Sequence, residues 1–261
     1  MLVSHEVPIS LLDQSRHFND YDYCLVHLLG THPRYRDYYE TATSLYDREV
    51  LLDNSIFELG KAFDASSFAA WVDKLNPTSY VIPDSLENAE ETVENFKRFT
   101  AEYKNLPGLK IGAVQGKNYH EITECYKFMA DNADIIAMSF DFSYYQFTGT
   151  GNTKLERQCS GRVNLISNLL ILNTWSDWKP HHLLGCSLAK EFRMYDKIPN
   201  IRSCDTSNPI VAGLQGIKYS SNFGLKIKPS QKLVEYIDAV PNEEQLALIN
   251  YNISQFRRIV D

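Results

Sequence analysis

The chain alternates short runs of strand-forming residues with longer segments whose apolar residues recur at helical spacing. This alternation predicts βαβ units and a parallel sheet, because two parallel strands need a crossover connection between them. No GxGxxG or P-loop turn follows any of the runs, which disfavours a doubly wound nucleotide-binding sheet. Seven or eight units in 261 residues favour an α/β fold, a single-domain (β/α)8 TIM-type barrel over residues 1–261.

The expected strands are short apolar runs bounded by polar residues. They cover residues 23–29, 49–53, 79–82, 109–115, 134–140, 182–188 and 201–204, with 217–219 as an eighth. The expected helices cover residues 65–75, 85–103, 119–129, 156–172 and 243–259. Asp64 is the expected N-cap of the first of these helices. Residues 142–151, after the fifth strand, are expected to form a long loop.

The composition predicts a cytoplasmic protein whose cysteines are reduced thiols. Hydrophobic residues make up 44% of the chain, and no run approaches the roughly 18 apolar residues of a membrane span. The N-terminus lacks the basic and apolar regions of a secretory signal. The five cysteines are odd in number and none are closely paired, and no zinc-ligand spacing occurs, so we expect no disulfide framework and no metal.

The charge is unevenly distributed along the sequence. The formal net charge is −7, yet residues 179–232 hold nine Lys and Arg against three Asp and Glu. A basic segment on an acidic chain fits either a face that binds a nucleic-acid backbone or an ordinary solvated surface. The sequence gives no sign of a membrane partner.

Polar residues end four of the expected strands. They are Asp53, Asp84, Gln115 and Asp205. In a parallel barrel such residues converge on one face. A carboxylate-lined site suits chemistry at a sugar carbon, where one acid attacks and another moves a proton. Each aspartate has an alternative role as the N-cap of the next helix, above all Asp84. Gly112 and Gly116 are expected to leave room for a ligand beside Gln115.

Several segments resemble one enzyme family. Residues 112–116 (Gly-Ala-Val-Gln-Gly) resemble the Gly-Ile-Val-Gln-Gly strand of the tRNA-guanine transglycosylases. Residues 53–58 (Asp-Asn-Ser-Ile-Phe-Glu) resemble the family's Asp-Ser-Gly-Gly-Phe-Gln motif, and 184–191 (Leu-Gly-Cys-Ser-Leu-Ala-Lys-Glu) its Ile-Gly-Gly-Leu-Ala-Val-Gly-Glu motif. Asp84 and Asp205 stand where the family has a base-holding aspartate and a nucleophilic aspartate. The resemblance covers residues 48–208.

The departures from the family point to a particular branch. The family's tRNA enzymes carry a CxCxxC and His zinc site near the C-terminus, and this sequence has none. It looks more like the short, zinc-free relatives of these queuosine-related enzymes, which place 7-deazaguanines in the DNA of phages and bacteria. The resemblance therefore implies DNA as the partner, with tRNA as the alternative, and the host cytoplasm if the protein is phage-encoded. A helper protein that opens the strands, or a homodimer, is compatible with the acidic net charge.

The resemblance implies a pentosyltransferase that needs no cofactor. Asp205 is implied as the nucleophile that attacks C1′ of a guanosine nucleotide, and Asp53 as the acid/base. The implied substrate-binding residues are Asp84, Gln115, Gly116, Gly185, Cys186, Ser187 and Glu191, the last of which would support the turn around residue 185. An N-glycosidase in which water resolves the intermediate, and a non-catalytic nucleic-acid-binding barrel, are the remaining alternatives.

Nucleic-acid contacts are expected from aromatic and basic residues. Tyr144 and Tyr145, in the loop of residues 142–151, are expected to stack on bases, and the loop's glycines would let it move as a lid. The alternative is a loop tucked into the core by its own aromatic side chains. The expected phosphate contacts are Arg157, Arg162, Lys190, Arg193 and Arg202, each of which is otherwise an ordinary surface charge.

Overall fold

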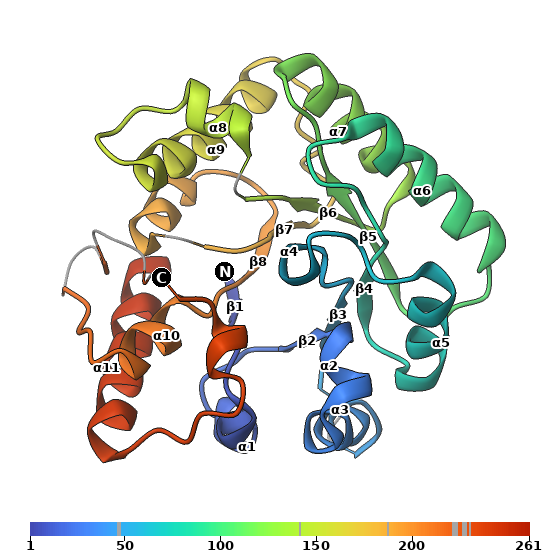
Figure 1. Cartoon of the computed structure of the whole chain (residues 1–261). Coiled ribbons are helices and arrows are strands. Elements are labelled where there is room, and N and C mark those ends of the chain that lie inside the picture. The colour runs from blue at the N-terminus through green and yellow to red at the C-terminus, as the bar shows by residue number, and fades with distance from the viewer. Residues whose placement is uncertain (46–47, 141, 187, 221–223, 226–228, 230) are drawn as a thin grey trace. The chain divides into compact units, whose positions relative to one another are not determined.

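Eight parallel strands, interspersed with helices, form one sheet in the order β1-β8-β7-β6-β5-β4-β3-β2 (Figure 1). The computed structural model describes residues 1–45, 48–140, 142–186, 188–220, 224–225, 229 and 231–261. The strands are β1 (Leu2–Ser4), β2 (Asp22–Leu25), β3 (Val50–Asp53), β4 (Ser79–Val81), β5 (Leu109–Val114), β6 (Ile135–Met138), β7 (His181–Leu183) and β8 (Ile201–Asp205). This arrangement is the (β/α)8 TIM-type fold, so the predicted fold class is confirmed.

The chain forms two compact units. Unit 1 comprises Met1–Asp20, Phe140–Trp175 and Leu183–Asp261, and unit 2 comprises Tyr21–Ser139 and Ser176–His182. That the chain is a single domain stays a prediction.

In unit 2, strands β2 to β6 pair in parallel, and they are buried apart from the first two residues of β5. Leu25 pairs with Asp53, and Val114 pairs with Met138. Every residue of β2, β3, β4 and β6 is buried, which is typical of parallel strands covered by helices on one side and by core side chains on the other. Asp53 is the last residue of β3 and Gln115 follows β5, so both lie at the carboxyl ends of their strands.

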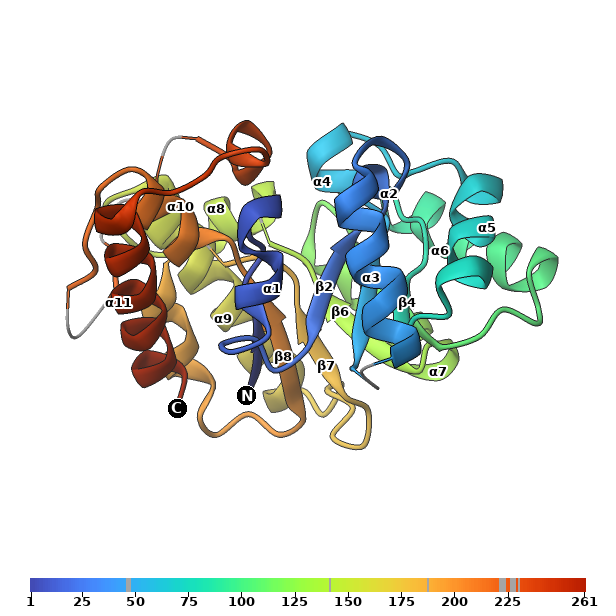
Figure 2. The same cartoon turned by 90° about the horizontal axis from the view of Figure 1, so that it is seen from below.

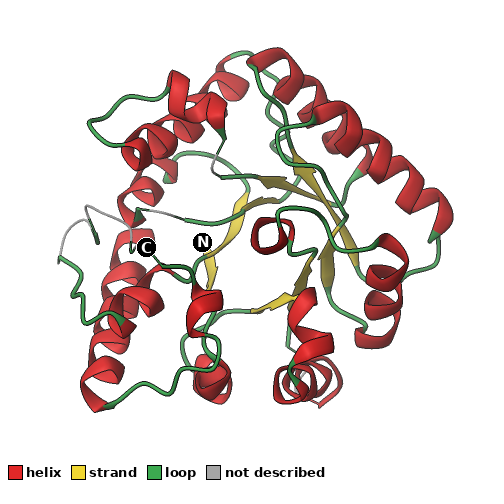
Figure 3. Cartoon of the chain, in the orientation of Figure 1, coloured by secondary structure: helices red, strands yellow, loops and turns green. Residues whose placement is uncertain are grey.

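Helices follow the strands of unit 2, and most of them lie outside the strands (Figure 3). They are α2 (Val26–Thr31), α3 (Pro33–Leu45), α4 (Ile56–Leu59), α5 (Ala65–Leu75), α6 (Ala89–Glu102) and α7 (Tyr119–Asn132). Helix α5 has the predicted bounds and the predicted cap, since the Asp64 carboxylate accepts a 2.9 Å hydrogen bond from the Ser67 amide. Phe68 and Val72 of α5 are fully buried, in line with their helical spacing.

Unit 1 contains β1 and β8, paired in parallel with Ser4 opposite Asp205, and the remaining helices. They are η1 (Ile9–Leu11), α1 (Leu12–Ser15), α8 (Ser143–Thr148), α9 (Lys154–Ile171), η2 (Ala189–Tyr195), α10 (Asn208–Leu214), η3 (Leu233–Tyr236) and α11 (Glu243–Val260). Helix α10 packs along α11, which ends the chain (Figure 2). A reciprocal capping box of Thr153 and Glu156 starts α9.

The prediction of an eighth strand at residues 217–219 is wrong. Strand β1, at the N-terminus, pairs with β8 instead. Residues 217–219 are held by other groups: the Tyr219 amide donates to the Asn252 side chain at 2.8 Å, and the Ile217 carbonyl accepts from the same side chain at 2.9 Å. The three residues of β1 are too few to show a period of two, which is why the sequence did not reveal them.

Three further boundaries lie four or more residues from the predictions. The strand expected over residues 182–188 is β7, which ends at Leu183. Residues 23–29 were expected to form one strand, but β2 ends at Leu25 and α2 begins at Val26. Residues 23–29 are apolar except for His27, and periodicity does not distinguish a strand from a helix in so short a run. Helix α6 begins at Ala89 rather than at residue 85, and its N-cap is Asn88, whose side chain accepts from the Glu91 amide. Asp84 is therefore not the cap of this helix.

The segment after β6 is more ordered than the expected loop. Residues 143–148 form α8, which packs against α9. Phe142 and Tyr145 are buried, so these two aromatic side chains pack into the core, as the alternative prediction had it. A Cβ on Gly149 would lie 1.8 Å from the Arg157 carbonyl oxygen. The lack of a side chain at Gly149 therefore lets the backbone pack closely against α9. This role differs from that of a hinge for a lid.

Candidate active site

Asp53 ends β3 and begins a tight turn. Its Oδ2 accepts a 2.7 Å hydrogen bond from the Ser55 amide, and Ser55 has a left-handed backbone with φ of 59°. An aspartate that bonds the amide two residues ahead in this way forms an Asx turn. The turn buries Asp53 and directs the next side chain, that of Asn54, toward the end of β4.

Asp84, Asn54 and Gln115 form a buried hydrogen-bonded cluster in unit 2. Asn54 Nδ2 donates to Asp84 Oδ1 at 2.8 Å, and Gln115 Nε2 donates to Asp84 Oδ2 at 2.6 Å. Asp84 is only 4% exposed. Both oxygens of its carboxylate thus accept a hydrogen bond from a side-chain amide group, which satisfies a buried acid without a cation.

Burial raises the pKa of Asp84 above its ordinary value. Desolvation is the largest cause, and the hydrogen bonds from Asn54 and Gln115 oppose it by favouring the charged form. A carboxyl group perturbed in this way at a strand end marks a candidate functional site.

The raised pKa predicts a pH dependence of stability that originates at Asp84. Between the ordinary aspartate pKa near about 4 and the higher folded value, the folded state binds this proton more tightly than the unfolded state. The contribution is therefore most favourable below about pH 4 and is lost as pH rises through the folded pKa. Asp84→Asn removes this pH-dependent contribution. In urea unfolding, the free energy of unfolding of the variant should therefore rise relative to that of the wild type from about pH 4 to 7. A difference that is constant across this range would contradict the assignment.

Gln115 is held in one orientation by its neighbours. The Glu87 amide donates to Gln115 Oε1 at 2.9 Å, while Gln115 Nε2 also lies 3.2 Å from Ser139 Oγ. The amide group of Gln115 is therefore directed toward Asp84 by the hydrogen-bond network. The expected free space at the flanking glycines is not found: a Cβ on Gly116 would lie 2.8 Å from the Ile122 amide nitrogen. The missing side chain at this position makes room for α7 rather than for a ligand.

Asp205 ends β8 in unit 1, beside the turn that follows β7. Its Oδ1 accepts a 3.1 Å hydrogen bond from the Gly185 amide, and the carboxylate is 4% exposed. Gly185 has φ of 63°, a conformation that glycine adopts without strain. Thr206 Oγ1 donates to the Cys186 carbonyl at 3.4 Å. The structure thus brings Asp205, Gly185 and Cys186 together, while Ser187 lies outside the described residues.

Arg162 and Glu191 form a fully buried ion pair beside the same turn. Arg162 Nε and Glu191 Oε1 are 2.6 Å apart, and both side chains are 0% exposed. Arg162 also donates to the carbonyl oxygens of Leu184 and Gly185. Glu191 reaches the turn through Arg162, in keeping with its expected supporting role. The expectation that Arg162 contacts a phosphate is corrected, because its guanidinium has no exposed surface.

The other expected nucleic-acid residues divide into buried and accessible side chains. Tyr145 is fully buried and burial raises its pKa, so its expected stacking on a base is corrected. Lys190 pairs with Glu156 at 2.9 Å and is 35% exposed. Arg157 Nη1 donates to the Gly151 carbonyl at 3.3 Å. Arg193 is exposed and Arg202 is half-buried.

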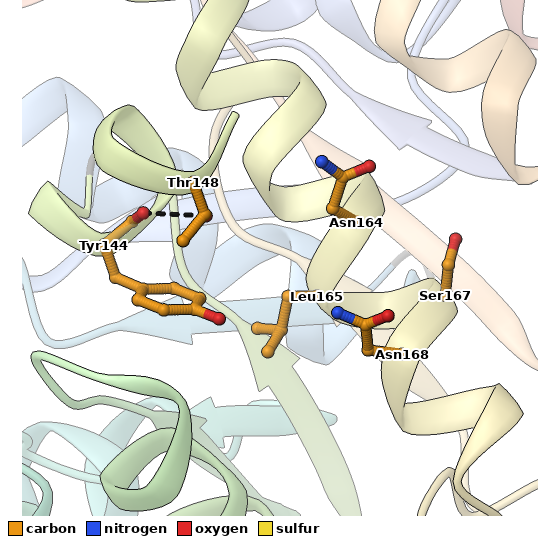
Figure 4. Close-up of a pocket in the computed structure, with 6 residues that line it drawn as sticks. All are labelled: Tyr144, Thr148, Asn164, Leu165, Ser167 and Asn168. Atoms are coloured by element: carbon orange, nitrogen blue, oxygen red, sulfur yellow. Dashed lines mark hydrogen bonds between the residues drawn. The ribbon is translucent and has the colours of Figure 1, made fainter. Parts of the chain in front are cut away.

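Tyr144 lines a pocket of about 340 Å³ beside α8 and α9 (Figure 4). The other lining residues are Thr148, Asn164, Leu165, Ser167 and Asn168. The ring of Tyr144 extends toward Leu165, and Thr148 Oγ1 donates to the Tyr144 carbonyl at 2.8 Å. Phe147, in the same helix, is 90% exposed. An aromatic ring, amide side chains and an apolar floor suit a planar polar ligand.

Sequence reasoning assigned no role to two members of the unit 2 cluster. Asn54 follows Asp53 directly, and Ser139 follows β6, where its Oγ donates to the Val114 carbonyl at 3.1 Å. Ser139 lay inside the strand expected over residues 134–140, and only the observed end of β6 at Met138 makes it a strand-end residue. The sequence carries no signal for Asn54, because its role depends on the left-handed turn at Ser55.

Among the described residues, no group of three or more His, Cys, Asp or Glu is arranged to hold a metal ion. None of the helices in the described ranges is long and apolar enough to cross a membrane. All five cysteines, which lie within these ranges, are buried free thiols. No protein-family model matches the chain, and no curated protein matches it.

Proposed function

We propose that the protein is a pentosyltransferase that exchanges guanine in DNA for a 7-deazaguanine base through a covalent aspartyl-glycosyl intermediate. The observation that carries the proposal is the buried cluster of Asp84 and Gln115 at the ends of adjacent strands β4 and β5. The resemblance of the surrounding segments to the tRNA-guanine transglycosylases supports the same reaction. The preference for DNA rests on the lack of the zinc motif in the sequence.

The cluster offers the hydrogen-bonding groups that guanine needs. Guanine donates from N1–H and its 2-amino group and accepts at O6. The Asp84 carboxylate accepts two hydrogen bonds, one at each oxygen, from the amide groups of Asn54 and Gln115. Gln115 presents Nε2 toward Asp84 because Oε1 is fixed by the Glu87 amide. Asp84 would therefore take the donor edge of the base, and Gln115 Nε2 would take O6.

The proposed chemistry uses two aspartates in succession. An oxygen of Asp205 attacks C1′ of the target nucleotide, the C1′–N9 bond breaks, and guanine leaves with the electron pair and takes the proton of the Asp53 carboxyl group. The resulting glycosyl ester keeps the sugar activated. Asp53 then accepts the ring N–H proton of the incoming 7-deazaguanine, whose nitrogen attacks C1′ and releases Asp205. Retaining glycosidases divide their work between two carboxylates in the same manner.

The target base must leave the stack before it reacts, so the substrate is either single-stranded DNA or a duplex with the base flipped out. Tyr144 and its pocket offer a stacking surface for a neighbouring unpaired base. The accessible basic residues Arg157, Lys190, Arg193 and Arg202 are the proposed phosphate contacts.

Tyr144→Ala is expected to weaken binding of single-stranded DNA. Loss of one base–aromatic stack costs about 1–3 kcal/mol, which corresponds to a rise in Kd of about 5- to 150-fold. Fluorescence anisotropy with a labelled oligonucleotide measures the change. The matched control is Trp178→Ala, which removes an exposed aromatic side chain that precedes β7 instead of following a strand. Equal losses in the two variants would argue against a specific contact at Tyr144.

The proposed function is tested by incubating the protein with radiolabelled guanine and three acceptors: single-stranded DNA, duplex DNA and bulk tRNA. Label in either DNA supports the proposal, and the ratio between the two DNAs reports whether the protein flips the base unaided. Incorporation of label into tRNA alone would contradict the proposal for DNA and would identify the protein as an enzyme that exchanges guanine in tRNA. Release of free guanine from DNA without incorporation would indicate an N-glycosidase.

A further inference from the structure

Arg162 is the largest fully buried side chain of the described residues, and it lies in the middle of α9. All three of its side-chain nitrogens have acceptors. Nε pairs with Glu191 Oε1 at 2.6 Å, Nη1 donates to the Leu184 carbonyl at 2.8 Å, and Nη2 donates to the Gly185 carbonyl at 3.0 Å. The guanidinium also lies 4.8 Å from the centre of the Phe140 ring.

Stability alone is a weak reason to bury this charge. Taking an ion pair out of water costs several kcal/mol, and well-packed apolar residues often serve a core as well or better. What an apolar side chain cannot do is bind two consecutive carbonyl groups. The planar guanidinium holds both in a fixed geometry, and lysine, with a single charged nitrogen, cannot reproduce it.

The two carbonyls belong to the turn that contacts Asp205. The Leu184 carbonyl and the Gly185 amide are parts of the same peptide group, which is planar, so the direction of one sets the direction of the other. The Gly185 amide donates to Asp205 Oδ1 at 3.1 Å. Arg162 therefore binds the carbonyl oxygen of the same peptide group whose N–H donates to the Asp205 carboxylate.

We propose that Arg162 is a positioning residue: it fixes the peptide between Leu184 and Gly185 so that the N–H holds the Asp205 carboxylate in one orientation. Its role in catalysis rests on the proposed function, in which Asp205 is the nucleophile. Glu191 balances the buried charge, and its Oε1 also accepts a 2.6 Å hydrogen bond from the Tyr195 hydroxyl, which donates to neither Leu184 nor Gly185.

The positioning is measured on the Gly185 amide itself. Only three of the twelve glycines follow a leucine, namely Gly30, Gly60 and Gly185. Labelling leucine carbonyl carbons with ¹³C and glycine nitrogens with ¹⁵N therefore yields three correlated NMR signals. Asp205→Asn identifies the Gly185 signal, because loss of the charged acceptor moves that amide proton upfield. Gly30→Ala identifies a second signal independently.

The informative variant is the double change Arg162→Met and Glu191→Leu. It removes the hydrogen bonds from Arg162 to the Leu184 and Gly185 carbonyls without leaving a buried charge. It should move the Gly185 signal upfield as Asp205→Asn does, and should speed exchange of this amide with solvent. Tyr195→Phe is the matched control, because it removes a hydroxyl from the same network but none of the Arg162 bonds. It should leave the signal in place. A Gly185 signal at its wild-type position in the double variant would overturn the proposal.

Steady-state kinetics of base exchange separate positioning from a structural role. The double variant should lower kcat by about 10- to 100-fold, as expected for a misplaced catalytic group, and leave KM for guanine within about twofold. Tyr195→Phe should leave both constants near wild type. If the wild-type protein exchanges no base, the proposed function fails, and the NMR result still decides whether Arg162 positions the turn.

Discussion

Asp205→Asn is expected to abolish base exchange while leaving the folded protein intact. Removal of a covalent nucleophile lowers kcat by about 10⁴-fold or more in enzymes whose catalytic groups act together. The amide oxygen of asparagine can still accept the 3.1 Å hydrogen bond from the Gly185 amide, so the turn keeps its partner. Exchange of radiolabelled guanine measures the loss, and circular dichroism and thermal unfolding establish that the fold is retained.

The covalent intermediate gives this prediction its sharpest form. Wild-type protein quenched in acid with a guanine-containing oligonucleotide should carry a mass increase of the oligonucleotide less guanine, and Asp205→Asn should carry none. Asp196→Asn is the control, since it alters an exposed carboxylate in the same unit. An Asp205→Asn protein that exchanges base within tenfold of the wild-type rate would rule Asp205 out as the nucleophile.

Arg162→Met is expected to be among the most destabilising single substitutions in unit 1. Removal of one partner of a buried ion pair leaves an uncompensated charge and costs about 3–5 kcal/mol. Here the remaining Glu191 carboxylate would be 0% exposed, and the carbonyls of Leu184 and Gly185 would lose their donors. Urea denaturation should show this as a large decrease in the midpoint at an unchanged slope.

The neighbouring surface pair provides the matched comparison. Lys190→Met breaks the partly exposed bridge from Lys190 to Glu156, which is worth about 0–1 kcal/mol. The double change Arg162→Met and Glu191→Leu should recover most of the loss, because no charge is then left unpaired in the core. A single Arg162→Met variant as stable as Lys190→Met would mean that water or a local rearrangement solvates Glu191.

The parts of the fold that the sequence predicted are those with local signals. Helix α5 matched at both ends because Asp64 caps it and its apolar residues have helical spacing. Strand β3 was found because its run stops on a polar residue. Strand β1 was missed because its three residues are too few to show a period of two. The break between β2 and α2 was missed because a short, mostly buried run shows no periodicity that distinguishes strands from helices. Helix α8 is six residues long, too short for a periodic signal.

The candidate site was predictable where position along a strand decides it. The strand-end rule selected Asp84, Gln115 and Asp205, and each has a hydrogen-bonded partner in the structure. Asp205 ends β8, Gln115 directly follows β5, and Asp84 lies three residues beyond the end of β4. Arg162, by contrast, was expected at the surface, because arginine is usually an exposed residue. The spacing held a contrary signal, since Cys159 and Ile166, three residues before and four after, put Arg162 on the buried side of α9. The partner that makes burial of an arginine tolerable, Glu191, is distant in sequence.

The pairing of Asp84 with Gln115 also bears on how the proposed site would discriminate between bases. Without a ligand the two groups satisfy each other, so an incoming guanine exchanges existing hydrogen bonds for new ones and gains little net free energy from them. A base with a different edge would leave the carboxylate and the amide unsatisfied in a buried setting, at a cost of about 1–3 kcal/mol for each group. The polar cluster would thus contribute mainly to rejecting wrong bases, and tight binding would have to come from stacking and from the covalent bond to the sugar.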